Sequence, residues 1–89
     1  MDMDTEAVQN IRKRLNLTQA QFGQLFGIHP MTVSKWERGE LSPSNYQKAL
    51  MMEFSKAAKE KQVRSTLAGV LIGMGIAAAL LLLLNAAKK

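Results

Sequence analysis

The chain divides into a patterned polar part and an uninterrupted apolar part. From Leu67 to Leu84, eighteen residues follow one another without a charged or hydrogen-bonding side chain. As one helix this run measures roughly 27 Å at about 1.5 Å per residue, which approaches the ~30 Å hydrocarbon core of a bilayer. The pattern therefore predicts a single C-terminal transmembrane helix over residues 67–85. A hydrophobic helix that docks on a partner protein, or a coat-like assembly, is the alternative.

The first residues show apolar positions at helical spacing. Val8, Ile11 and Leu15 recur every three or four residues, which predicts a helix over about residues 5–15. Asp4 or Thr5 can cap its start.

A second, short helix is predicted to begin after Thr18. Thr18 and Gln21 have the spacing of a capping box, and Gly27 is placed as a left-handed C-cap. The residues expected on its buried side are Ala20, Phe22, Leu25 and Phe26.

A third helix is predicted over residues 30–38. His29 and Pro30 have the order of an N-cap and a first-turn proline, and Gly39 ends the helix. Residues 40–44 are predicted to form a loop.

A fourth helix is predicted to start either at Ser42-Pro43 or at Ser44, which has Gln47 three positions later. The residues expected on its inward side are Tyr46, Ala49, Leu50, Phe54 and Ala57.

This fourth helix is expected to continue unbroken toward the apolar run. No glycine or proline interrupts residues 44–68, and the pairs Lys56–Glu60 and Glu60–Arg64 have opposite charges at i,i+4. A break near residues 62–66 is the alternative.

Charge supports the interpretation of the apolar run as a membrane span. Residues 1–43 carry five basic and five acidic side chains, whereas residues 44–89 carry seven basic and two acidic ones. The basic excess lies before and after the run, at Lys56, Lys59, Lys61 and Arg64 and at Lys88 and Lys89. Because basic residues beside a span set its orientation and attract anionic lipid, the N-terminal part is expected in the cytoplasm.

Four segments follow from these patterns. They are a folded domain over residues 1–58, a basic juxtamembrane helical linker over 59–66, the transmembrane helix over 67–85 and a short basic tail over 86–89. Gly69, Gly73 and Ala77 would line one face of the span, and small residues let two membrane helices approach closely. A homodimer or a larger membrane protein complex is therefore expected.

The two short helices around Gly27 form a helix-turn-helix pattern. The residues that carry a more specific likeness are Leu17–Phe22, Phe26–Ile28, Thr32–Gly39 and Pro43. With these residues the chain resembles the Cro/C1-type (XRE) helix-turn-helix family over roughly residues 6–58. The resemblance implies an all-α domain of four to five helices that binds DNA, with the third helix in the major groove.

The DNA-binding residues implied by the resemblance are Gln19, His29, Met31, Thr32, Ser34, Lys35 and Arg38. Gln19 would bind phosphate at a helix N-terminus, and Arg38 would make a flanking phosphate contact. Lys35 is the best candidate for reading bases, because a lysine donates to guanine O6 and N7.

The resemblance also implies structural roles for other residues of the motif. Glu37 would pair with Arg12 or Arg14. The residues expected in the core are Phe22, Phe26, Val33 and Trp36.

Two functions remain open at this point. One is a membrane-anchored DNA-binding protein, a regulator or a DNA tether, at the cytoplasmic membrane of a bacterium. The other is an accessory subunit of a larger membrane complex, in which the helix-turn-helix binds protein. Pro30 and Met31 at the start of the third helix favour the second function, since neither side chain forms hydrogen bonds with bases. No catalytic residue, metal site or cofactor is expected, because the sequence shows no nucleophile–base pair or ligand cluster.

Overall fold

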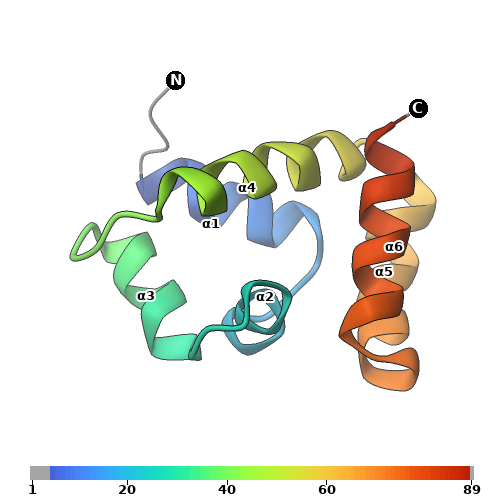
Figure 1. Cartoon of the computed structure of the whole chain (residues 1–89), viewed down its shortest axis with the longest axis horizontal. Coiled ribbons are helices and arrows are strands. Elements are labelled where there is room, and N and C mark those ends of the chain that lie inside the picture. Colours follow the sequence, from blue (N-terminus) through green and yellow to red (C-terminus); the bar gives the residue numbers. More distant parts are fainter. Residues whose placement is uncertain (1–4, 89) are drawn as a thin grey trace.

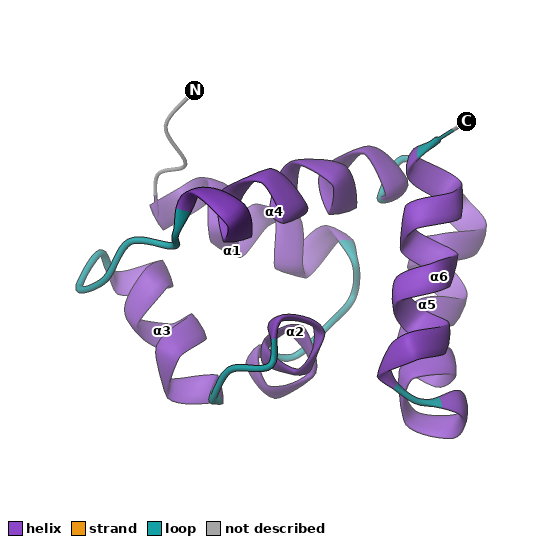
Figure 2. Ribbon diagram, viewed as in Figure 1, coloured by secondary structure: helices purple, strands orange, loops and turns teal. Residues whose placement is uncertain are grey.

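The computed structural model describes residues 5–88, which form six α-helices and no strand. The helices are α1 (Thr5–Arg14), α2 (Gln19–Phe26), α3 (Pro30–Arg38), α4 (Asn45–Ala57), α5 (Lys61–Met74) and α6 (Ile76–Ala87) (Figures 1 and 2). The all-α class is confirmed for this range. The predicted cap at Asp4 and the basic residue Lys89 lie outside the described residues.

Local capping signals define the starts of the central helices. The Thr18 hydroxyl accepts from the Gln21 backbone N–H, while the Gln21 side chain accepts from the Thr18 N–H. Ser44 and Gln47 form the same reciprocal pair at the start of α4. The predicted capping box of α2 is confirmed, and of the two starts considered for α4 the structure has the one at Ser44.

The inward side of α4 differs from the prediction. Met51, Phe54 and Ala57 are buried, whereas Tyr46 and Ala49 are exposed. α4 packs against α1 and α6, and the residues of α4 that are buried in the core, Met51, Phe54 and Ala57, all lie in its C-terminal half. Ala20, predicted on the buried side of α2, is also exposed.

The predicted continuous helix from residue 44 to the apolar run is wrong. α4 ends at Ala57 and α5 begins at Lys61, so the break precedes the alternative at 62–66. Arg64 Nη1 donates to the Ala58 carbonyl at 2.6 Å and so satisfies a backbone acceptor released by the end of α4. Neither predicted i,i+4 ion pair forms, and Lys56 instead pairs with Glu53 at 3.1 Å.

The single transmembrane helix predicted over residues 67–85 is also wrong. Gly75 has φ 99° and ψ 178°, a backbone conformation that is essentially restricted to glycine. The chain reverses there, and α5 and α6 lie side by side as a hairpin (Figure 1). None of the helices found in residues 5–88 has both the length and the apolar character needed to cross a bilayer. Gly69 and Gly73 lie on α5 while Ala77 lies on α6, so the three residues do not share one helix face.

The hairpin shares one hydrophobic core with α1–α4. Leu67 and Leu83 are fully buried, as are Phe22 and Phe54 of the preceding helices, and all four belong to one cluster. α6 packs against α4 and α2. The buried side of the apolar run therefore covers the end of the molecule opposite α3 (Figure 1).

Candidate nucleic-acid interface

The turn between α2 and α3 depends on two glycines. Gly27 ends α2 with φ 68°, a left-handed conformation that glycine adopts without steric cost. A Cβ on Gly23 would lie 2.8 Å from the Ile28 carbonyl oxygen, so only glycine lets the turn fold back on α2. Gly23 was not singled out from the sequence. The available signal was its place inside a predicted helix, where an isolated glycine indicates close packing.

One face of α3 is anchored in the core. Val33 and Trp36 are buried, and the Phe26 ring contacts the Trp36 and Phe54 rings edge-on or tilted, with centroids 5.6 and 5.5 Å apart. The predicted core positions are confirmed, with Phe26 half-buried rather than fully enclosed. The opposite face of α3 is therefore directed outward.

A buried ion pair fixes α3 against α1. Arg12 Nε lies 2.7 Å from Glu37 Oε2, and Arg12 Nη2 lies 3.1 Å from Oε1. The Glu37 side chain is only 5% exposed and that of Arg12 13%. This bidentate geometry combines charge with fixed orientation, and it confirms the expected pairing of Glu37 with a basic residue of the first helix.

Gln19 joins the same network from α2. Its Nε2 donates to Glu37 Oε1 at 3.2 Å, so one of the two amide N–H groups is used inside the protein. The side chain is half-buried at the first residue of α2. The structure thus places Gln19 at a helix N-terminus, as expected, with a hydrogen bond to Glu37 that the sequence did not indicate.

The outward strip of α3 contains Met31, Lys35 and Arg38, which recur at helical spacing. Met31 and Arg38 are exposed, and Lys35 is half-buried. Arg38 Nε pairs with Glu40 Oε2 at 2.7 Å, whereas the ion pairs found among residues 5–88 leave Lys35 unpaired.

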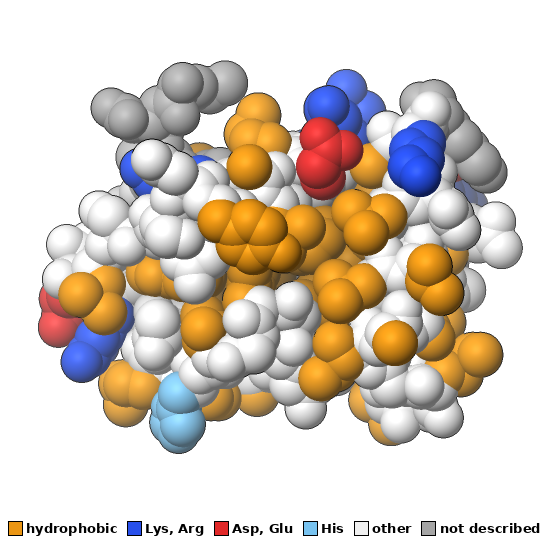
Figure 3. Space-filling model, in the orientation of Figure 1, with side chains coloured by type: hydrophobic (Ala, Val, Ile, Leu, Met, Phe, Trp, Pro, Cys, Tyr) orange, Lys and Arg blue, Asp and Glu red, His pale blue; other side chains and the backbone are white. Residues whose placement is uncertain are grey.

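The remaining predicted contact residues lie around this strip. His29 is exposed at the N-cap of α3, where its Nδ1 accepts from the Met31 N–H at 3.0 Å, and the surface view shows it at the lower edge (Figure 3). Thr32 and Ser34 are half-buried on α3. The structure therefore brings the six predicted residues from His29 to Arg38 onto one short helix and its cap.

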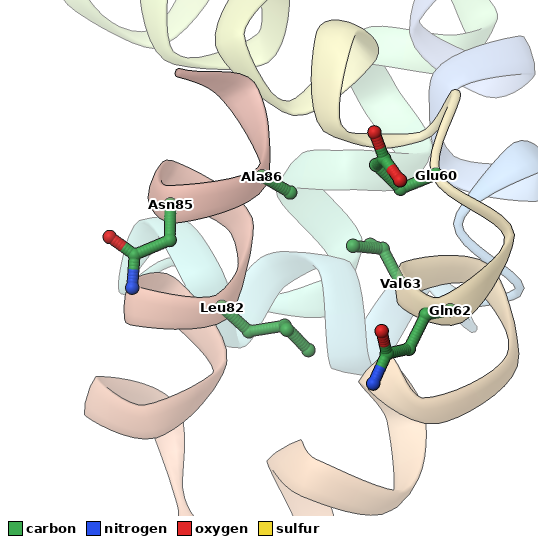
Figure 4. Close-up of a pocket in the computed structure, with 6 residues that line it drawn as sticks. All are labelled: Glu60, Gln62, Val63, Leu82, Asn85 and Ala86. Atoms are coloured by element: carbon green, nitrogen blue, oxygen red, sulfur yellow. The ribbon is translucent and has the colours of Figure 1, made fainter. Parts of the chain in front are cut away.

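A pocket at the open end of the hairpin does not belong to this interface. It is lined by Glu60, Gln62, Val63, Leu82, Asn85 and Ala86, with Val63 and Leu82 facing each other between α5 and α6 (Figure 4). α3 lies at the other end of the molecule (Figure 1). Within residues 5–88, no three His, Cys, Asp or Glu side chains come close enough together to hold a metal ion.

Residues 8–46 match the sequence model of a helix-turn-helix family. The match begins in α1, ends in α4 and includes all of α2 and α3, while α5 and α6 lie outside it. Comparison of the chain with curated proteins and with solved structures gave no match. The matched residues contain the turn between α2 and α3, so the similarity to helix-turn-helix proteins in sequence and the geometry of these two helices agree.

Proposed function

We propose that the helix-turn-helix domain binds double-stranded DNA, with α3 in the major groove and α2 across the phosphate backbone. The observation that carries the proposal is the division of α3 into two faces. Val33 and Trp36 hold one face in the core, and the other presents Lys35 and Arg38 outward.

The start of α2 is suited to a phosphate contact. The backbone N–H groups of a helix N-terminus attract anions, and Gln19 stands at this position with its side chain held by Glu37. Because the hydrogen bond restricts the Gln19 rotamer before DNA arrives, little side-chain freedom is lost on binding.

Lys35 is the residue that we propose to enter the groove. Its ammonium has no carboxylate partner among the described residues and can donate to guanine O6 and N7. Met31, one turn earlier, can contact a thymine methyl group, and Arg38, one turn later, can exchange Glu40 for a phosphate. His29, Thr32 and Ser34 would make the neighbouring polar contacts.

A protein ligand for the same surface is the second candidate. Met31 and Leu41 are large apolar side chains exposed near Arg38, and the charge of Arg38 is already balanced by Glu40. A surface of this kind suits a partly apolar protein partner better than the bare phosphate backbone of DNA.

Titration of duplex DNA of mixed sequence with the full chain, followed by fluorescence anisotropy, separates the two candidates. For DNA binding, the logarithm of the affinity should fall linearly with the logarithm of the salt concentration. Lys35→Ala removes a proposed base contact and should weaken binding about fivefold to tenfold.

Lys59→Ala is the matched control. It removes the same charge from the turn between α4 and α5, far from α3 (Figure 1), and should leave the affinity within about twofold of wild type, because exposed charges beyond the Debye length are screened. Absence of binding at low salt, or equal losses in both variants, would contradict the proposal and leave the protein ligand as the better explanation.

A further inference from the structure

The connection between α1 and α2 turns at Asn16. Among the described residues, Asn16 is the one residue other than glycine with a positive φ, 59°. Its N–H donates to the Lys13 carbonyl at 3.0 Å, and the N–H of Leu17 donates to the Arg12 carbonyl at 3.3 Å. These two bonds form a Schellman motif, in which the left-handed position is usually glycine and sometimes asparagine. Glycine would therefore satisfy the backbone, and a role of the asparagine side chain has to be found elsewhere.

The Asn16 side chain reaches the α5–α6 hairpin. Its Nδ2 donates to the Arg64 carbonyl of α5 at 2.8 Å, across 48 positions of sequence. In Figure 1 the connection between α1 and α2 runs along the side of the molecule that faces the hairpin. Asn16 therefore joins the hairpin directly to the segment that leads into α2.

The acceptor of this bond is itself fixed. Arg64 Nη1 donates to the Ala58 carbonyl at the end of α4 at 2.6 Å. Val63, which precedes Arg64, and Leu17, which follows Asn16, are buried in the same core cluster. The Arg64 carbonyl is therefore held by α4 and by the core, and a hydrogen bond to it restricts the chain at Asn16.

The restricted segment leads to the proposed phosphate contact. The Leu17 carbonyl accepts from Arg12 Nη1 at 3.0 Å, and Thr18 is the N-cap of α2. Gln19 follows as the first residue of α2. Only two residues lie between Asn16 and Gln19, so a bond that fixes Asn16 also restricts the place where α2 begins.

We propose that Asn16 is a positioning residue, through which the α5–α6 hairpin holds the start of α2 in place for DNA. The inference rests on the DNA binding proposed above. It gives the hairpin a part in that binding, although the hairpin lies at the end of the molecule opposite α3 (Figure 1). Asn16 acts through Gln19 and not by a contact of its own with DNA. Because a mobile start of α2 would have to be ordered when a phosphate binds, the Asn16–Arg64 bond lowers the entropic cost of binding.

Amide hydrogen exchange of the free full-length protein, measured by NMR, tests the positioning without DNA. Asn16→Gly keeps the left-handed backbone without strain and removes the side-chain bond. The Phe22 N–H donates to the Thr18 carbonyl at 2.9 Å and so reports on the start of α2. Its exchange should become about threefold to tenfold faster, because one hydrogen bond no longer holds the segment. The Phe54 N–H inside α4 should change less, since it reports on the core.

Ser65→Ala is the matched control. Ser65 Oγ donates to the Gln62 carbonyl at 3.2 Å, so this substitution also removes an exposed side-chain-to-backbone bond, but one that lies within α5. It should leave the exchange of the Phe22 N–H within about twofold of wild type. Circular dichroism verifies that both variants fold.

The affinity for duplex DNA tests the consequence. Asn16→Gly should weaken binding at least about threefold, while Ser65→Ala stays within about twofold of wild type. Unchanged exchange at Phe22, an equal increase at Phe22 and Phe54, or an unchanged affinity of Asn16→Gly would overturn the role of Asn16. If Asn16→Gly exchanges as expected but the wild-type chain binds no DNA, the proposed function fails while the link between the hairpin and α2 holds.

Discussion

Glu37 determines how the surface of α3 is presented, although it does not belong to that surface. Its carboxylate receives two hydrogen bonds from Arg12 of α1 and one from Gln19 of α2. A buried bidentate pair is costly to break, because loss of one partner leaves a charge without compensation. The network therefore ties the orientation of α3 to the stability of the fold.

Replacing Glu37 should be far more damaging than replacing Glu40, even though each pairs with an arginine at 2.7 Å. Glu37→Ala leaves Arg12 largely buried and unpaired, and we expect a loss of about 2–4 kcal/mol in the free energy of unfolding. Glu40→Ala removes an exposed pair and should change it by at most about 1 kcal/mol. Urea unfolding followed by circular dichroism measures both. If the two variants lost the same free energy of unfolding, the buried ion pair would stabilise the fold no more than the exposed one.

At the scale of the helices, features set by neighbouring residues could be predicted from the sequence. The starts of α2, α3 and α4 follow from Thr18, His29 and Ser44, whose capping partners lie two or three positions later. The buried face of α4 could not be found in this way. It depends on α6, which is distant in sequence and packs against α4 near the C-terminal end of that helix (Figure 1). Spacing alone predicts Tyr46 on the inward side, whereas the structure exposes it.

Two glycines of the hairpin should respond oppositely to alanine. Gly75→Ala places a side chain at φ 99° and ψ 178°, and the strain should reduce the free energy of unfolding by about 1–3 kcal/mol. Gly69→Ala adds a methyl group to open space within α5 and should increase it by about 0.5–1 kcal/mol. Thermal unfolding of wild type and both variants, followed by circular dichroism, measures the two changes in the free energy of unfolding. If Gly75→Ala were as stable as wild type, the tight reversal at Gly75 would be contradicted.

At the scale of the whole molecule, the structure of the apolar run was the hardest to predict from the sequence. Length and lack of charge predict a span, but the same eighteen residues also suit two helices that bury one side each. Which of these forms depends on whether a complementary apolar surface exists elsewhere in the chain. Here α2 and α4 provide it, and Leu67 and Leu83 complete their core. The position of residues 29–38 on one helix and its cap could be predicted, because it follows from the local helix-turn-helix pattern, while their contacts with DNA stay a prediction. The Gln19–Glu37 contact could not be predicted, because it depends on tertiary packing.

If the hairpin and the helix-turn-helix domain form one core, damage to the hairpin should destabilise α3. Leu83 of α6 is fully buried, so Leu83→Ala should reduce the free energy of unfolding by about 2–5 kcal/mol. Leu81→Ala, at an exposed site two residues earlier, should change it by about 0.5 kcal/mol or less. Trp36 is the sole tryptophan and is buried at α3. Its fluorescence therefore reports on the helix-turn-helix, while circular dichroism reports on all helices.

For Leu83→Ala both signals should shift together in urea, at low protein concentration, because small single cores unfold cooperatively. A Trp36 transition that stays at the wild-type midpoint while the circular dichroism transition moves would mean that the hairpin unfolds separately from the domain. In that case the core that joins α6 to α2 and α4 would not hold in solution.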